Sequence, residues 1–113
     1  MQVSVISPYR LLYVQLAGEL DHHCVSELRS RLDGELIRSG VRNLALDFSG
    51  VGFMDSSGLG FIMGRHKLVS ALGGRLIVCG MNESTAKLFK MCGLQRIAIV
   101  ADNIDDGIKE LSE

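Results

Sequence analysis

The stretch NLALDFSGVGFMDSSGLGF, residues 43–61, joins an apolar run to a polar turn and then to the start of a helical pattern. Residues 43–48 are mostly apolar and are bounded by turn residues, which predicts a central strand. From about residue 57 to residue 72, apolar side chains recur at the spacing of one helical face, and two glycines end the pattern. The predicted apolar face consists of Leu59, Ile62, Met63, His66 and Val69.

The rest of the chain continues this alternation of strand and helix. Further strands are predicted at residues 2–6, 11–17, 75–79 and 95–100, and further helices at residues 24–38, 83–91 and 102–113. The order ββαβαβαβα is typical of an α/β fold with a mixed, mostly parallel sheet and right-handed crossovers. In such sheets functional groups gather after the carboxyl ends of strands. Two polar segments stand at such positions, GELDHHC (18–24) and FMDSSG (53–58).

Length and composition indicate a single globular domain over residues 1–113. The chain has 113 residues, of which 47% are hydrophobic and 22% charged, so a packed core is expected. The net charge is −1 and the basic residues are scattered, which argues against a nucleic-acid-binding surface. No apolar run approaches the ~20 residues of a membrane helix, and the first residues do not resemble a signal peptide. We therefore expect a cytoplasmic protein without membrane or nucleic-acid partners.

The three cysteines are odd in number and widely separated, which favours neither a disulfide framework nor a zinc site. Cys79 and Cys92 are interpreted as small buried hydrophobic residues.

The DSS segment has a simple structural interpretation, because Asp and Ser side chains often cap the first turn of a helix. Capping does not explain Gly58, Gly60 and Gly64, each of which costs about 0.5 to 1 kcal/mol relative to alanine inside a helix. Gly60 and Gly64 share a face, which predicts a low surface for a partner or for a neighbouring element of the same domain. Phe53 and Met54 are expected to anchor the end of the preceding strand.

Enzymatic and metal-binding alternatives have weaker support. The nucleophile-elbow pattern G-x-S-x-G is absent around both serines, so we expect no enzyme. His22 and His23 are adjacent residues whose side chains should diverge, and no metal-ligand spacing follows them. His66 is interpreted as a core-edge residue. No metal or other cofactor is expected.

Phosphorylation is the third interpretation of the serine motif. A phosphate on Ser56 would add about −1.5 to −2 charges at a helix N-terminus, where free amides and the helix dipole tolerate it. A partner docked on the glycines would then meet new charge and bulk, while the fold stayed intact.

GELDHHC and FMDSSGLGFIMGRHK (53–67) together resemble the bacterial anti-sigma factor antagonists, single-domain members of the STAS superfamily. The resemblance extends to GGRLIVCG (73–80) and AKLFKMCGL (86–94), and is strongest to the sporulation antagonists that control a forespore sigma factor. It implies a four-to-five-stranded sheet flanked by about four helices. The threonine often found after the two histidines is Cys24 in this chain.

The resemblance also implies a regulatory cycle. The unphosphorylated antagonist binds an anti-sigma factor that is also a serine kinase and so frees the sigma factor. The kinase then phosphorylates the first serine of DSSG, here Ser56, and a serine phosphatase resets the cycle. The residues expected to bind the partner are Asp21, His22, His23, Asp55, Ser57, Gly58, Leu59, Gly60 and Gly64. The alternative is a constitutive scaffold of the same fold, such as a subunit of a lipid transporter.

Overall fold

A computed structural model describes residues 1–113, in which five strands form one sheet in the order β1-β2-β3-β4-β5. β1 is antiparallel to β2, and the other neighbouring pairs are parallel, so the predicted mixed and mostly parallel sheet is confirmed. The strands are β1 (Gln2–Ile6), β2 (Leu11–Leu20), β3 (Asn43–Met54), β4 (Leu76–Cys79) and β5 (Ile99–Ala101).

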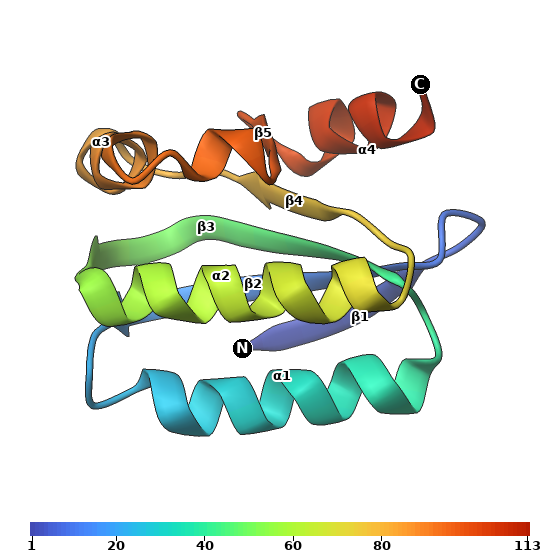
Figure 1. Cartoon of the computed structure of the whole chain (residues 1–113), viewed down its shortest axis with the longest axis horizontal. Helices are drawn as coiled ribbons and strands as arrows, with labels where there is room; N and C mark the ends of the chain where they lie inside the picture. The colour runs from blue at the N-terminus through green and yellow to red at the C-terminus, as the bar shows by residue number, and fades with distance from the viewer.

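Four α-helices and one short 3₁₀ helix, η1, flank the sheet. They are α1 (Val25–Ser39), α2 (Ser56–Ala71), α3 (Glu83–Met91), η1 (Leu94–Arg96) and α4 (Ile104–Ser112). Figure 1 shows α1 and α2 side by side on one face of the sheet, both beginning at the same end of the molecule. The predicted set of four helices is confirmed.

Two cores lie on opposite faces of the sheet. The larger one joins the sheet to α1, α2 and α3, with Leu32, Ile62 and Phe89 among its fully buried side chains. The smaller one joins Ala45 and Ile77 to the apolar side of α4. Because β3 is covered on both faces, residues 43–48 are all buried, which explains the apolar run in the sequence.

Asp47 is the one carboxylate within this buried run of β3. It accepts hydrogen bonds from the amide and hydroxyl of Ser49, at 2.9 and 2.6 Å, and from the hydroxyl of Tyr13. Burial raises the pKa of Asp47, but the bonds from Ser49 and Tyr13 outweigh it and hold the pKa below its ordinary value. The carboxylate is therefore a satisfied structural group.

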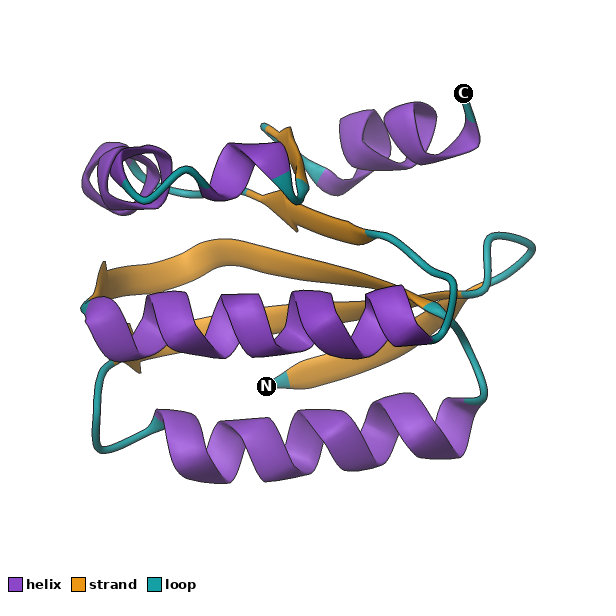
Figure 2. Ribbon diagram, viewed as in Figure 1, coloured by secondary structure: helices purple, strands orange, loops and turns teal.

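Three strands differ in length from the prediction: β2 ends at Leu20 instead of residue 17, β3 ends at Met54 instead of residue 48, and β5 is shorter than the predicted 95–100. Figure 2 shows the long β3 and the short β5. β3 continues to Met54 because it pairs with β2 up to Leu20, beyond irregularities in the register. The strand predicted at 95–100 is wrong in its first half. There the amides of Arg96 and Ile97 donate to carbonyls three residues earlier, which forms η1 and leaves no ladder bonds for a strand.

Two predicted burial positions are also wrong. Met63 is 46% exposed, although its spacing suggested the apolar face of α2. α2 packs against both the sheet and α1, and this rotates its buried stripe toward Arg65, which is only 5% exposed. Cys92 is exposed at the C-cap of α3, whereas Cys79 is buried as predicted. None of the helices combines the length and the apolar character that a membrane span requires.

Candidate functional site

The two polar segments predicted from the sequence lie next to each other at the carboxyl edge of the sheet. Leu20 at the end of β2 pairs with Met54 at the end of β3. The amide of Asp55 donates to the carbonyl of Leu20 at 3.3 Å, which links the beginning of one turn to the beginning of the other. Asp21 and Ser56 therefore belong to one edge of the molecule.

Asp55 is the N-cap of α2. Its backbone is extended, and its Oδ1 accepts a hydrogen bond from the amide of Ser57 at 2.8 Å. Its carbonyl accepts from the amides of Gly58 and Leu59. The capping interpretation is confirmed for Asp55, and neither serine is needed for the cap.

Ser56 is the first residue of α2 and is exposed, whereas Ser57 is half-buried. The amide of Ser57 donates the capping hydrogen bond to Asp55. The hydroxyl of Ser56 makes no hydrogen bond within the protein. This hydroxyl is therefore free to react at the positive end of the helix dipole.

Ser56 shares an exposed line along α2 with three other residues. Gly60, Met63 and Lys67 follow it at intervals of four, three and four residues, which places them on one side of the helix. All four residues are exposed. We call Ser56, Gly60, Met63 and Lys67 the outer stripe of α2. Met63 was missed because apolar spacing assigned it to the core, but its spacing from Ser56 is a signal that could have identified it.

Gly60 and Gly64 face open space, because a Cβ atom at either position would meet nothing within 4 Å. The alternative that these glycines serve close packing within the domain is therefore wrong. The two glycines therefore leave an accessible surface without side chains on the helix that begins at Ser56.

Gly58 and Leu59 are buried and serve the interior, in contrast to their expected place on a partner surface. A Cβ at position 58 would lie 2.3 Å from Cγ of Met54 and 3.0 Å from the carbonyl oxygen of Leu20. Glycine is needed there because α2 begins in close contact with the ends of β2 and β3. Leu59 is 7% exposed and belongs to the larger core.

Phe53 is 50% exposed, so the expectation that it anchors the strand end is wrong. It points away from the core because neighbouring residues of a strand face opposite sides, and Met54 takes the buried side at 6% exposure. An aromatic side chain therefore lies exposed three residues before Ser56.

Asp21 holds the turn between β2 and α1. Its Oδ1 accepts from the amides of His23 and Cys24, at 3.0 and 3.2 Å. Hydrogen bonding from the Cys24 side chain is the largest effect on the pKa of Asp21 and lowers it; desolvation opposes this, and the two amide bonds add to the lowering. The same contact raises the pKa of the Cys24 thiol. Asp21 is thus an ionised group with a structural role at this edge.

The histidines of this turn are exposed. The rings of His22 and His23 meet edge to face, with centroids 5.7 Å apart. No group of three metal-ligating side chains occurs in the structure. Both imidazoles remain available for contact with a partner.

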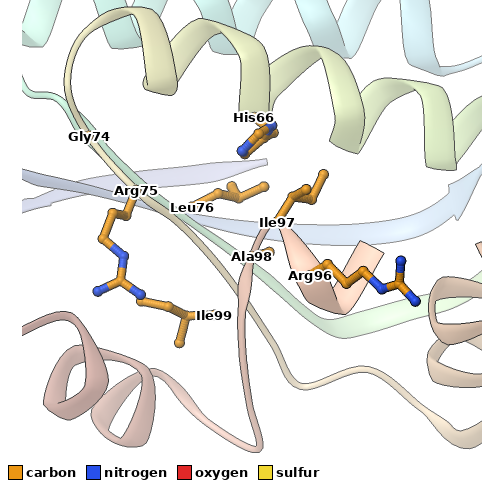
Figure 3. Close-up of a pocket in the computed structure, with 8 residues that line it drawn as sticks. All are labelled: His66, Gly74, Arg75, Leu76, Arg96, Ile97, Ala98 and Ile99. Carbon is orange, nitrogen blue, oxygen red and sulfur yellow. The ribbon is translucent and has the colours of Figure 1, made fainter. Parts of the chain in front are cut away.

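A hollow of about 230 Å³ lies away from this edge, at the amino ends of β4 and β5 (Figure 3). His66, Arg75 and Arg96 are its charged or titratable lining residues. Figure 3 shows the side chains of Arg75 and Arg96 extending away from each other, so the hollow does not concentrate their charge. It does not compete with the Ser56 edge as a candidate site.

Known proteins resemble this chain in sequence and in fold. The sequence profile of the STAS domain matches residues 2–107. An anti-sigma F factor antagonist from Paenibacillus polymyxa is 37% identical over 111 residues, which cover 98% of this chain and 95% of that protein.

Two solved structures are similar to the chain throughout. One is the anti-sigma factor antagonist SpoIIAA in its unphosphorylated form, with a TM-score of 0.74, 27% identity and coverage of 98% and 96% of the two chains. The other is the Bacillus cell fate determinant SpoIIAA in the phosphorylated form, with a TM-score of 0.70, 28% identity and coverage of 93% and 94%.

Proposed function

The chain belongs to the STAS domain family, and from this membership and the edge around Ser56 we propose that it is an anti-sigma factor antagonist controlled by phosphorylation. The relative from Paenibacillus polymyxa, an anti-sigma F factor antagonist, supports the general function. In the proposed cycle the unphosphorylated chain binds an anti-sigma factor and thereby frees a sigma factor. That anti-sigma factor is also a serine kinase, which transfers the γ-phosphoryl group of ATP to Oγ of Ser56 and releases ADP. A serine phosphatase hydrolyses the phosphate and restores binding.

The outer stripe of α2 is the observation that carries the proposal. Ser56 has a free, exposed hydroxyl, and it lies in line with Gly60 and Met63 on an open face. A partner that packs on Met63 and over Gly60 would approach the hydroxyl closely. The site of modification and the docking surface are thus parts of one face.

Electrostatics explain how the phosphate would switch binding without unfolding the chain. At the first residue of α2 the phosphate would meet the positive end of the helix dipole, which stabilises an anion there by about 0.3 to 1 kcal/mol. The carboxylates of Asp55 and Asp21 already occupy this edge, so a docked partner would meet concentrated negative charge. Exposed Phe53 and the two histidines enlarge the proposed surface.

The test uses the two adjacent serines as a matched pair. The purified chain, incubated with its cognate kinase and ATP, should gain one phosphate by intact-mass measurement. Ser56→Ala should abolish this gain. Ser57→Ala should retain it, because Ser57 is half-buried and its amide is bound to the cap residue Asp55. Phosphate incorporation that persists in Ser56→Ala would contradict the assignment.

The alternative of a constitutive scaffold makes a different prediction. A scaffold subunit of a lipid transporter would copurify with a membrane ATPase, and its function would survive Ser56→Asp. No contact in the structure favours this alternative over the switch.

A further inference from the structure

An arginine stands directly before each of three neighbouring parallel strands. Arg10 precedes β2, Arg42 precedes β3 and Arg75 precedes β4. Because parallel strands begin at the same edge of a sheet, these residues gather at the edge opposite Ser56. Figure 1 shows the β1–β2 turn, the α1–β3 loop and the α2–β4 loop converging at the right of the molecule, while α2 begins at the left.

A buried asparagine connects these three loops. The amide of Asn43 donates to the carbonyl of Arg10 at 3.0 Å, and its side-chain nitrogen donates to the carbonyl of Tyr9 at 2.8 Å. Its Oδ1 accepts from the amide of Arg75 at 2.8 Å. The amide of Arg42 also donates to the carbonyl of Arg10, at 3.3 Å. The backbones that carry the arginines are therefore fixed before any ligand arrives, which lowers the entropic cost of binding.

The three arginines line one hollow of about 350 Å³, together with Asn43 and with Leu111 of α4. No acidic residue lines this hollow. The ion pairs of the structure are Arg38 with Glu35 and Arg65 with Asp33, so none of the three arginines has a carboxylate partner. Its volume falls within the ~300 to 1,000 Å³ typical of small-molecule sites.

The charge and the hydrogen-bond donors of the hollow favour an anionic ligand. Three unpaired positive charges around one space repel one another, and an anion between them would remove that repulsion. Guanidinium groups present planar pairs of donors that match the oxygens of phosphate groups. We propose that Arg10, Arg42 and Arg75 form a binding site for a compact phosphate-bearing anion, such as a diphosphate group. The proposal does not depend on the switch at Ser56, which lies at the other edge.

The first test needs no variant. Pyrophosphate is titrated into the isotope-labelled chain at constant ionic strength, with sodium chloride as the compensating salt. We expect saturable shifts of the amide signals of Arg10, Asn43, Gly73 and Arg75, with the signals of α1 and α3 unmoved. Shifts spread over all basic surfaces, or reproduced by sodium chloride alone, would overturn the proposal.

Charge-matched variants then measure the contribution of the arginines. The site variant is Arg10→Gln, Arg42→Gln and Arg75→Gln. The control variant is Arg29→Gln, Arg31→Gln and Lys87→Gln, which removes the same charge from exposed positions on α1 and α3. We expect the site variant to bind pyrophosphate at least about tenfold more weakly and the control to remain within about twofold of the unaltered chain. If both variants bound pyrophosphate equally weakly, the loss would come from the change in net charge, and the proposed site would be wrong.

A conservative single variant guards the test against misfolding, and two competing ligands distinguish the possible sources of the anion. The single variant Arg75→Lys keeps the charge and loses the planar donor pair, so it should still weaken binding severalfold. ADP that competes with pyrophosphate supports recognition of the diphosphate group. Binding of poly-glutamate without any response to pyrophosphate would overturn the proposal in favour of an acidic polypeptide surface. Ser56→Ala should bind pyrophosphate as the unaltered chain does.

Discussion

Two glycines near the start of α2 illustrate how much depends on a single residue's surroundings. A Cβ atom added at Gly58 would collide with Met54 and approach the carbonyl of Leu20, whereas one added at Gly60 would meet open space. Both carry the same helix-propensity cost of about 1 kcal/mol relative to alanine. Only for Gly58 does the fold itself explain why alanine is absent.

Alanine at these two positions should therefore have opposite effects. Gly58→Ala should lower the free energy of unfolding by about 1 to 2 kcal/mol, because the added methyl overpacks the strand ends. Gly60→Ala should raise it by about 0.5 to 1 kcal/mol, because the methyl finds free space and the helix gains propensity. Urea unfolding of both variants measures this difference. A stabilised Gly58→Ala would show that Met54 yields without cost.

At the scale of the element, α2 has two faces with separate tasks. Its outer stripe carries the proposed switch, and its inner side packs on the sheet and on α1. The inner side includes Arg65, whose Nε lies 3.0 Å from Oδ1 of Asp33 on α1. Its guanidinium also lies 5.2 Å from the ring centroid of Phe61, and its Nη1 is buried without a hydrogen-bond partner. Burial lowers the pKa of Arg65, and Asp33 partly reverses this.

The Arg65–Asp33 pair should be easier to replace than to break. Arg65→Met should change the free energy of unfolding by less than about 1 kcal/mol, because it removes a buried, incompletely satisfied charge and leaves behind only Asp33, whose side chain is 30% exposed to water. Asp33→Ala should cost about 1 to 2 kcal/mol by leaving the guanidinium unpaired. This cost is below the ~3 to 5 kcal/mol of fully buried pairs because the Asp33 side chain is 30% exposed.

The double variant Arg65→Met/Asp33→Ala provides the control. It should recover most of the stability that Asp33→Ala loses, as urea unfolding would measure. A larger loss in Arg65→Met than in Asp33→Ala would mean that the arginine stabilises the fold through its packing on Phe61.

At the scale of the whole molecule, the two edges of the sheet carry opposite charge. Asp21 and Asp55 directly follow β2 and β3, while arginines directly precede β2, β3 and β4. A net charge of −1 conceals this separation. The acidic edge with the proposed switch and the cationic edge can therefore serve different partners at the same time.

Ser56→Asp tests whether the switch acts on binding without changing the fold. The variant should keep the amide spectrum of the parent beyond α2 and its neighbours. Its free energy of unfolding should stay within about 0.5 kcal/mol, because an exposed acid at a helix N-terminus is tolerated. Its affinity for the anti-sigma factor should fall at least about tenfold, or about 1.4 kcal/mol, by calorimetry. A variant that is globally altered, or that binds as tightly as the parent, would contradict the proposal.

Much of the architecture could be predicted because its signals are local. Alternating apolar runs and helical spacings identified the strands and the four α-helices, and the start of α3 and the cap at Asp55 follow from side chains within one turn. The adjacency of the two polar turns followed from one rule about parallel strands. The errors at β5 and η1 arose where a turn after Gly93 competed with an apolar run for the same amides.

The sequence by itself determined the order of the elements, the mostly parallel sheet and the edge at which Ser56 lies, because periodicity, capping and strand direction need no knowledge of distant residues. Only the tertiary structure decided that Phe53 and Met63 are exposed, that Gly58 is buried and that Arg65 faces Asp33. It also decided that three arginines from separate loops share one hollow. The physical reason is that burial depends on strand register and on how α1 packs against α2, and these contacts join residues far apart in the chain.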